Sequence, residues 1–337
     1  MTRLTQAIVN LTRLTSLSTR VLADAAGTTA FVQRPPSYTV PAFVNLGVSG
    51  YFGGGSDGVR ISGIDKITFA GDTKTTLSAT LSTARQSLAG MSNSDVAGYF
   101  GGGSDGSSIS GIDKITFPAD TKTTLSATLT SARSLLAGMA NSGVAGYFGG
   151  GDDGSPISGI DKITFPADTK TTLSATLTTA RSQLAGMANS AVAGYFGGGE
   201  DSVGSLSGID KITFPADTKT TLSATLTAAR RFLAGMSNSG VAGYFGGGTA
   251  TTNIIDKITF PADTKTTLSA TLSTARSQLA GMANSGVAGY FGGGSDSVGN
   301  VSGIDKITFP ADTKTTLSAT LTSGRFLLAG MANSGYL

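Results

Sequence analysis

Short runs in which apolar and polar residues alternate recur along the chain at a nearly constant interval. In the third copy these runs cover residues 147–151, 160–165, 172–177 and 184–188. Alternation with a period of two is typical of half-buried β-strands, and glycine, proline and asparagine between the runs favour tight turns. The last run is rich in alanine and glycine, which suits a crowded inner strand. The pattern therefore predicts four short strands in every copy.

The copies are marked by the sequence Tyr-Phe-Gly-Gly-Gly. It begins at Tyr51, Tyr99, Tyr147, Tyr195, Tyr244 and Tyr290. A repeat of about 40 to 50 residues with several strands and a glycine cluster is typical of a propeller blade. The last copy stops after its inner strand, and the first copy enters at its Tyr-Phe strand. We therefore expect an all-β, six-bladed propeller whose first blade is completed by strands from both ends of the chain.

A different pattern occupies the N-terminal segment. Its small and apolar residues follow the three-and-four spacing of a helix that buries one stripe, at Leu4, Ala7, Leu11, Leu14, Ser18, Val21 and Ala25. Gly27 ends this helix, and Arg34-Pro35-Pro36 indicates an extended linker. We expect an anchor over residues 1–36 and a propeller over 37–337. A secretory signal is the competing interpretation, because residues 23–25 resemble a cleavage site.

Composition removes several classes of function. The net charge is +3 with 13% charged residues, and lysine and arginine are spread through the copies, so a nucleic-acid-binding stripe is not supported. The chain has no cysteine and no histidine, which excludes disulfides, thiol nucleophiles and the commonest metal ligands. No run of about 18 apolar residues is present, so no membrane insertion is expected. We expect no cofactor and no metal site.

Six aspartates and six arginines occupy equivalent places in the copies. They are Asp65, Asp113, Asp161, Asp210, Asp256 and Asp305, and Arg85, Arg133, Arg181, Arg230, Arg276 and Arg325. Residues repeated in every copy are interpreted as architectural, with the aspartates holding turns or pairing with the arginines between blades. Glycoside hydrolysis needs a few carboxylates in one asymmetric site. The sequence therefore predicts a protein without catalytic residues.

The loops differ between the two faces expected for the disc. With strands labelled a to d from the axis outward, the a–b and c–d turns share one face, and their sequences Asn-Ser-X and Pro-Ala-Asp-Thr-Lys-Thr-Thr hardly change. We call this the uniform face. The variable face carries the b–c loops at 56–60, 104–108, 152–156, 200–204, 249–253 and 295–299, and the d–a connections at 85–87, 133–135, 181–183, 230–232, 276–278 and 325–327. Its divergence favours either a recognition surface or unconstrained drift.

Polar and aromatic side chains of the variable face are the candidate ligand-binding residues, because they supply hydrogen bonds and stacking area. They are Asp57, Arg60, Asp105, Asp153, Asp201, Asn253, Asp296, Gln86, Gln183, Arg231, Phe232, Gln278 and Phe326. The loops with Ser-Asp-Gly or Asp-Asp-Gly lack the ligand count of a twelve-residue calcium loop.

The order of a small-residue strand, Tyr-Phe-Gly-Gly, Ile-Asp-Lys-Ile-Thr-Phe, Ala-Thr-Leu and Ala-Arg resembles a kelch repeat from about residue 42 to 337. The kelch tryptophan is missing, and Leu77 and its equivalents stand in its place. The combination of Tyr-Phe-Gly-Gly-Gly with Asp-Lys-Ile-Thr-Phe also resembles repeats in structural proteins of tailed phages, especially those that infect cyanobacteria.

The phage resemblance implies a non-enzymatic virion appendage, such as a tail fibre, spike or capsid decoration. Such a protein would attach to other virion proteins through residues 1–36, possess an N-terminal helix able to form a homo-oligomer, and contact host surface polysaccharide through the variable face. The alternative is a cellular or secreted lectin-like or scaffold propeller that binds a protein partner. A glycan-cleaving enzyme, and a packing protein that binds nothing specific, also remain open.

Overall fold

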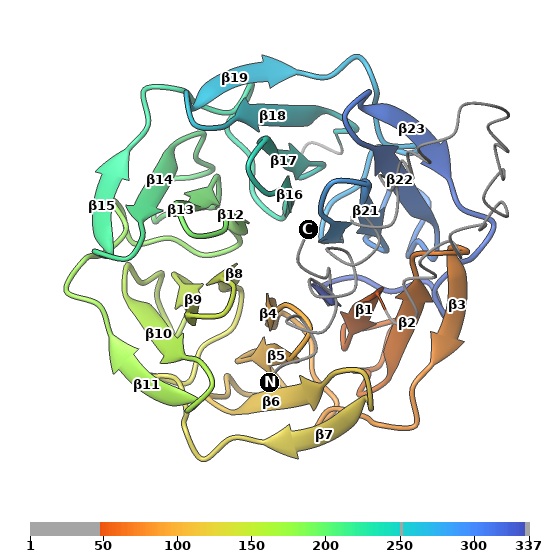
Figure 1. Ribbon diagram of the computed structural model, residues 1–337, viewed down its shortest axis with the longest axis horizontal. Helices are drawn as coiled ribbons and strands as arrows, with labels where there is room; N and C mark the ends of the chain where they lie inside the picture. The colour runs from red at the N-terminus through yellow and green to blue at the C-terminus, as the bar shows by residue number, and fades with distance from the viewer. Residues whose placement is uncertain (1–47, 250–251, 334–337) are drawn as a thin grey trace, which may run out of the picture. The chain divides into compact units, whose positions relative to one another are not determined.

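Six four-stranded antiparallel sheets surround a central axis in the computed structural model, which describes residues 48–249 and 252–333 (Figure 1). The chain is therefore a six-bladed β-propeller, as the repeat predicts. The expected anchor over residues 1–36 and the first residues of the predicted propeller domain, 37–47, lie outside the described residues.

Each blade orders its strands from the axis outward. The blades are β24 (Ala329–Asn333), β1 (Ser49–Gly53), β2 (Ile64–Thr68) and β3 (Thr73–Thr76); β4 (Ala89–Asn93), β5 (Ala97–Gly101), β6 (Ile112–Thr116) and β7 (Thr121–Thr124); β8 (Ala137–Asn141), β9 (Ala145–Gly149), β10 (Ile160–Thr164) and β11 (Thr169–Thr172); β12 (Ala185–Asn189), β13 (Ala193–Gly197), β14 (Ile209–Thr213) and β15 (Thr218–Thr221); β16 (Ala234–Asn238), β17 (Ala242–Gly246), β18 (Ile255–Thr259) and β19 (Thr264–Thr267); β20 (Ala280–Asn284), β21 (Ala288–Gly292), β22 (Ile304–Thr308) and β23 (Thr313–Thr316).

The ring is closed by strands from opposite ends of the chain. β24 pairs antiparallel with β1, in a register that sets Tyr51 opposite Met331 and Gly53 opposite Ala329. This pairing confirms the predicted closure. The edge of β1 that faces the axis is therefore paired with β24, so it is not open for pairing with another chain.

The hydrophobic core lies between neighbouring blades. Tyr99 and Ile112 pack in one cluster with Phe148 and Ile163 of the following blade, whereas Phe100 packs in another with residues of the preceding blade. Alternate side chains of a strand point to opposite faces of its sheet, so both faces of each blade are covered. This explains why the Ala-Gly-Tyr-Phe-Gly strands are buried at every position.

The outermost strand differs from the prediction. The alternation over residues 172–177 indicated a strand, but the structure has β11 at Thr169–Thr172, in residues assigned to the c–d turn. The segment after β11 crosses to the next blade, with Leu177 and Leu184 buried and Leu173 partly buried against the core. The prediction was wrong because an extended crossover that buries alternate leucines has the same period as a strand.

Tyrosine, lysine and aspartate connect each blade to the next. Tyr51 Oη donates to Asp120 Oδ1 at 2.7 Å, and Lys66 Nζ lies 2.7 Å from Asp120 Oδ2. Asp120 lies in the c–d turn of the following blade, where its φ of 55° allows the carboxylate to turn back. The same contacts recur at Tyr99, Lys114 and Asp168; Tyr147, Lys162 and Asp217; Tyr195, Lys211 and Asp263; Tyr244, Lys257 and Asp312; and Tyr290, Lys306 and Asp72.

These contacts predict a cooperative alkaline transition. Burial, followed by the hydrogen bond to aspartate, raises the pKa of each of the six tyrosines above its usual value. A group whose pKa is raised on folding contributes stability below its unfolded pKa of about 10, and this stability is lost as the pH rises further. Absorbance at 295 nm should show the six tyrosines ionising together with loss of the circular dichroism signal. Ionisation of all tyrosines near pH 10 with the fold intact would contradict this.

Candidate functional site

The recurring aspartates and arginines form buried ion pairs. Arg133 Nη2 lies 3.1 Å from Asp161 Oδ2, and both side chains are almost fully buried. Asp161 also accepts hydrogen bonds from the backbone and hydroxyl of Thr130, in the crossover that enters this blade, and from Thr172. The predicted pairing is confirmed, and it fastens each crossover to the blade that follows. The other pairs are Arg85–Asp113, Arg181–Asp210, Arg230–Asp256, Arg276–Asp305 and Arg325–Asp65.

In the pair of Asp65 and Arg325, the surroundings favour the charged form of the carboxyl. At Asp65, burial alone would raise the pKa, but hydrogen bonds from Thr322, the nearby Arg325 and a hydrogen bond from Thr76 together hold it below its usual value. Burial lowers the pKa of Arg325, and the charge of Asp65 opposes that shift. These groups are enclosed by the blades, so their role is structural.

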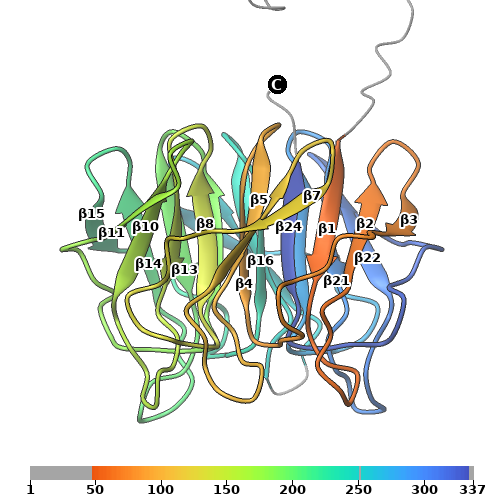
Figure 2. The same ribbon diagram turned by 90° about the horizontal axis from the view of Figure 1, so that it is seen from below.

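The structure confirms the predicted assignment of loops to faces. On one face, Gln86 of a d–a connection forms a β-bridge with Ser104 of a b–c loop. On the other, the backbone N–H of Phe165 in a c–d turn donates to the carbonyl of Val144 in an a–b turn. Figure 2 shows the two sets of loops at opposite edges of the disc, with the a–b and c–d turns at the upper edge.

The constancy of the uniform face has a structural cause. Asn93 Oδ1 accepts the backbone N–H of Gly143 in the next blade at 2.8 Å, and Ser190 Oγ accepts that of Ser142. The turn residues therefore bind neighbouring blades and cannot change freely. At the tips of the b–c loops, a side chain added at Gly106 or Gly154 would meet no atom within 4 Å. The contrast between the faces therefore does not by itself separate recognition from drift.

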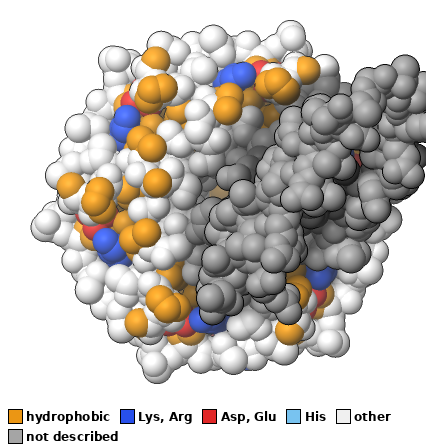
Figure 3. Space-filling model, viewed as in Figure 1, with side chains coloured by type: hydrophobic (Ala, Val, Ile, Leu, Met, Phe, Trp, Pro, Cys, Tyr) orange, Lys and Arg blue, Asp and Glu red, His pale blue; other side chains and the backbone are white. Residues whose placement is uncertain are grey.

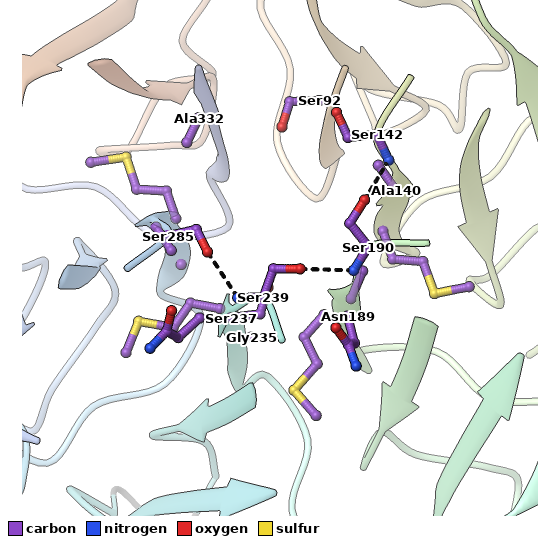
Figure 4. Close-up of a pocket in the computed structure, with 18 of the residues that line it drawn as sticks. Ser92, Ala140, Ser142, Asn189, Ser190, Gly235, Ser237, Ser239, Ser285 and Ala332 are labelled. Atoms are coloured by element: carbon purple, nitrogen blue, oxygen red, sulfur yellow. Dashed lines mark hydrogen bonds between the residues drawn. The ribbon is translucent and has the colours of Figure 1, made fainter. Parts of the chain in front are cut away.

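A pocket with a volume of about 920 Å³ opens on the uniform face, around the axis. Figure 4 shows Ser92 and Ser237 on opposite inner strands, and Ser142, Ser190 and Ser239 linked by hydrogen bonds around the mouth. Glycine, methionine, alanine, serine, asparagine, valine and proline line this pocket, without a charged side chain among the described residues. It therefore offers no described carboxylate, lysine or arginine for acid–base chemistry.

The rim around this pocket is partly apolar. The exposed residues of the a–b turns include Val96, Val144, Val192, Val241 and Val287. Figure 3 shows apolar side chains recurring around this face beside positively and negatively charged ones. One position of the a–b turns differs between copies and is Asp95, Gly143, Ala191, Gly240 or Gly286, and Ser92 and Ser237 stand where other copies have alanine. The rim is therefore similar, but not identical, from blade to blade.

The candidate aspartates of the b–c loops are engaged within their own loops. Asp57, Asp105, Asp201 and Asp296 each accept a backbone N–H from two residues further along. At Asp201, the hydrogen bonds from Val203 and Gly204 lower the pKa of the carboxyl below its usual value. These side chains stabilise turns, which is a sufficient structural reason for their presence. Arg60 and Asp153 are exposed, and Asn253 is half-buried next to residues 250–251, which are not described.

The d–a connections meet at the axis in a closed ring of backbone hydrogen bonds. The N–H of each residue donates to the carbonyl of its counterpart in the preceding blade, at 2.7 to 2.9 Å. The ring consists of Ser87, Leu135, Gln183, Phe232, Gln278 and Leu327, all with φ between 54° and 60°. Polar and apolar members alternate around the axis. They line a small axial pocket of about 70 Å³ on the variable face.

This ring brings together the candidates Gln183, Phe232 and Gln278. Gln86, Arg231 and Phe326 each precede a ring residue. Arg231 hydrogen bonds through its backbone with Thr249 of a b–c loop, and Phe326 is bridged to Ser56. The structure therefore divides the candidates into two groups. The axial group lies in the d–a connections and consists of Gln86, Gln183, Arg231, Phe232, Gln278 and Phe326. The other candidates lie in separate b–c loops.

One residue that contacts the axial group could not be identified as a candidate from its loop type alone. Glu200 is the only glutamate of the chain, and it occupies a place where other copies have serine, aspartate or threonine. Glu200 forms an ion pair with Arg231 and accepts a hydrogen bond from Gln183 Nε2 at 3.0 Å. The guanidinium of Arg231 also lies 5.9 Å from the centre of the Phe232 ring. Its uniqueness in a repetitive sequence was the signal that could have identified it.

No protein-family model matches this chain, and neither does any curated protein. Within residues 48–249 and 252–333, no group of three or more acidic side chains is placed to hold a metal ion. The described residues also contain no helix long and apolar enough to cross a membrane.

Proposed function

We propose that this protein is a non-enzymatic recognition module that contacts surface glycans through the variable face of its propeller and is attached to a virion through residues 1–36. The virion attachment and the kelch-like relationship rest on the repeat resemblances. Glycan recognition rests on the axial ring of d–a connections.

One observation carries the proposal: six residues of the axial ring have left-handed backbone conformations, and none of them is glycine. This conformation costs a residue with a side chain about 1 kcal/mol relative to glycine. The hydrogen bonds of the ring involve backbone atoms and would form equally well with glycine. Each copy nevertheless keeps a side chain here, and the side chains differ between copies, which favours a role in binding.

The chemistry of the ring suits a carbohydrate. Phe232 supplies an apolar ring face, and Gln183 and Gln278 supply amide donors and acceptors. Sugars present both apolar C–H faces and hydroxyl groups, so they fit a surface that alternates between these types. A ligand on a cell surface can also reach an axial site from outside the disc, without entering the space between two blades.

A protein partner is the second candidate. Val203 and Val298, at the tips of two b–c loops, are 93% and 94% exposed. Apolar side chains held out in solvent are more typical of protein-binding surfaces than of carbohydrate sites. Under this alternative, the protein is a cellular or secreted lectin-like or scaffold propeller that binds a protein partner.

The proposal predicts that the full-length chain binds a glycan array and that the variable face is responsible. Replacing Gln86, Arg231 and Phe326 by serine, the residue at the equivalent Ser134, Ser182 and Ser277, should weaken binding at least about tenfold, because polar and stacking contacts of about 1 kcal/mol or more are lost. A matched control replaces Val144 and Val192 on the uniform face by threonine, and should bind normally.

Binding that survives the variable-face changes but is lost in the control would contradict the proposal. An array without signal, together with a specific protein captured through Val203 and Val298, would favour the second candidate. In that case, replacing both valines by serine should abolish the capture.

A further inference from the structure

We infer that Gln183, Glu200, Arg231 and Phe232 form a subsite for a neutral pyranose sugar on the variable face, where the β12–β15 blade meets the crossover into the β16–β19 blade. This inference deepens the proposed function and rests on it. It assigns recognition to one sector of a ring whose blades are otherwise alike.

Two residues that occur at no equivalent position in other copies meet in this sector. Glu200 replaces the serine found at Ser56, Ser104 and Ser295, and Arg231 replaces the serine found at Ser134, Ser182 and Ser277. They come from consecutive blade segments and form an ion pair. Independent drift would not be expected to place an acid and a base of complementary charge side by side. The pair is therefore better explained as one built feature.

The carboxylate of Glu200 is fixed from both sides. Arg231 Nη1 binds Oε1, and Gln183 Nε2 donates to Oε2 at 3.0 Å. Each carboxylate oxygen can accept a further hydrogen bond, so the group remains able to accept from a hydroxyl. The side chains of Arg231 and Glu200 are 35% and 25% exposed, respectively, so a ligand can reach them.

The arrangement also leaves polar atoms without partners. Arg231 Nε and Gln183 Oε1 are buried, and neither has a hydrogen-bond partner within the described residues. Unsatisfied buried donors and acceptors are costly, so a ligand group that pairs with either atom would be favoured. A hydroxyl group both donates and accepts, so hydroxyls can satisfy the donor on Arg231 and the acceptor on Gln183.

Phe232 provides the apolar surface of the subsite. Its ring lies beside the Arg231 guanidinium, and together with Gln183 it lines the axial pocket of about 70 Å³. That volume admits a small substituent, whereas a ligand-sized pocket of roughly 300 Å³ or more would be needed to enclose a ring. A pyranose would therefore lie over Phe232 with one substituent directed into the axial pocket.

The charge of the subsite favours a neutral sugar. Glu200 and Arg231 neutralise each other, and Asp201 follows directly in the same loop. A sugar carboxylate would meet Glu200 and Asp201 with a single nearby cation already engaged in an ion pair. Acidic sugars are therefore expected to bind more weakly than neutral ones of the same size.

The repeat supplies substitutions that the fold already accepts elsewhere. In the full-length chain, Glu200→Ser, Arg231→Ser and Phe232→Leu each install the residue present at equivalent positions, so folding should be preserved. Titration with the methyl glycosides of glucose, galactose and mannose, followed by saturation-transfer NMR, should show a loss of at least tenfold in affinity for the sugar that binds the parent. Methyl glucuronide tests the acidic class. Val192→Thr, on the uniform face, is the control and should bind as the parent does.

A gain-of-function variant tests sufficiency. Ser87→Gln, Ser104→Glu, Ser134→Arg and Leu135→Phe together rebuild the four side chains two blades away, and should raise the stoichiometry from one sugar to two.

The outcomes separate the two levels of the proposal. Sugar binding that is unchanged in all three single variants, or a stoichiometry that stays at one in the rebuilt chain, would overturn this subsite and leave glycan recognition by the variable face standing. Tighter binding of the glucuronide than of the neutral glycosides would overturn the assignment of a neutral sugar. A parent protein that binds no glycan, on the array or in titration, would overturn both.

Discussion

Replacing Gly138 by alanine is expected to destabilise the propeller by about 3 kcal/mol or more, because the added methyl group would overpack a contact between two backbones. Gly138 lies in the inner strand β8, and a Cβ built there would be 2.3 Å from the carbonyl oxygen of Gly90 in β4. A flexible side chain could move away, but both groups belong to strands held in paired sheets. Relief therefore requires the blades to separate at the axis.

The matched control for this change is Gly111→Ala, outside the inner ring. A Cβ at Gly111 would meet no atom within 4 Å, so its effect should lie within about 0.5 kcal/mol. Urea unfolding followed by circular dichroism measures both free energies of unfolding. Equal stability of the two variants would contradict this prediction, because it would mean that the inner strands can move apart without cost.

The second large effect is expected from Asp161→Asn. The substitution keeps the size of the side chain but leaves the buried charge of Arg133 without its counterion, and such a loss costs about 3 to 5 kcal/mol. Thr130 and Thr172 would also lose their charged acceptor. Because the pair is shielded from solvent, added salt should change the loss little.

Two further variants test that cause by denaturant unfolding. Asp153→Asn, an exposed loop residue, should alter stability by no more than about 0.5 kcal/mol. The double variant Arg133→Met with Asp161→Asn should be more stable than Asp161→Asn alone, because the buried charge is removed with its partner. A double variant that is less stable than the single one would mean that packing of the arginine, and not its charge, is what the blade requires.

Much of the fold could be predicted because each copy repeats the same local pattern. The Tyr-Phe strand, the Ile-Asp-Lys-Ile strand and the small-residue inner strand follow from period-two alternation and turn residues, and the Asp161–Arg133 pairing follows from their repetition. The outermost strand was misplaced because Leu173 and Leu177 lie in a crossover and not in a strand. Their alternating spacing is the same in both cases, and it does not show whether the backbone pairs with a neighbouring strand. The contacts of Tyr51 and Lys66 with Asp120 were missed, since they join residues from neighbouring copies.

The candidate site was only partly predictable for a similar reason. Gln183, Arg231 and Phe232 were identified by their divergence from the repeat, but nothing in the linear order joins them to Glu200. Gln183 contacts Glu200 through the end of the blade they share, and Arg231 reaches it from the next crossover. Their proximity depends on how the crossovers converge at the axis.

The sequence by itself determined the number of blades, the closure by the two ends and the assignment of loops to faces, because these depend on local periodicity and on the order of strands. Only the tertiary structure decided which divergent side chains meet, why the uniform face is constant and where the backbone ring closes at the axis. Those properties depend on distances between residues that are 17 to 50 positions apart, which are set by the convergence of the crossovers and the packing of one blade against the next.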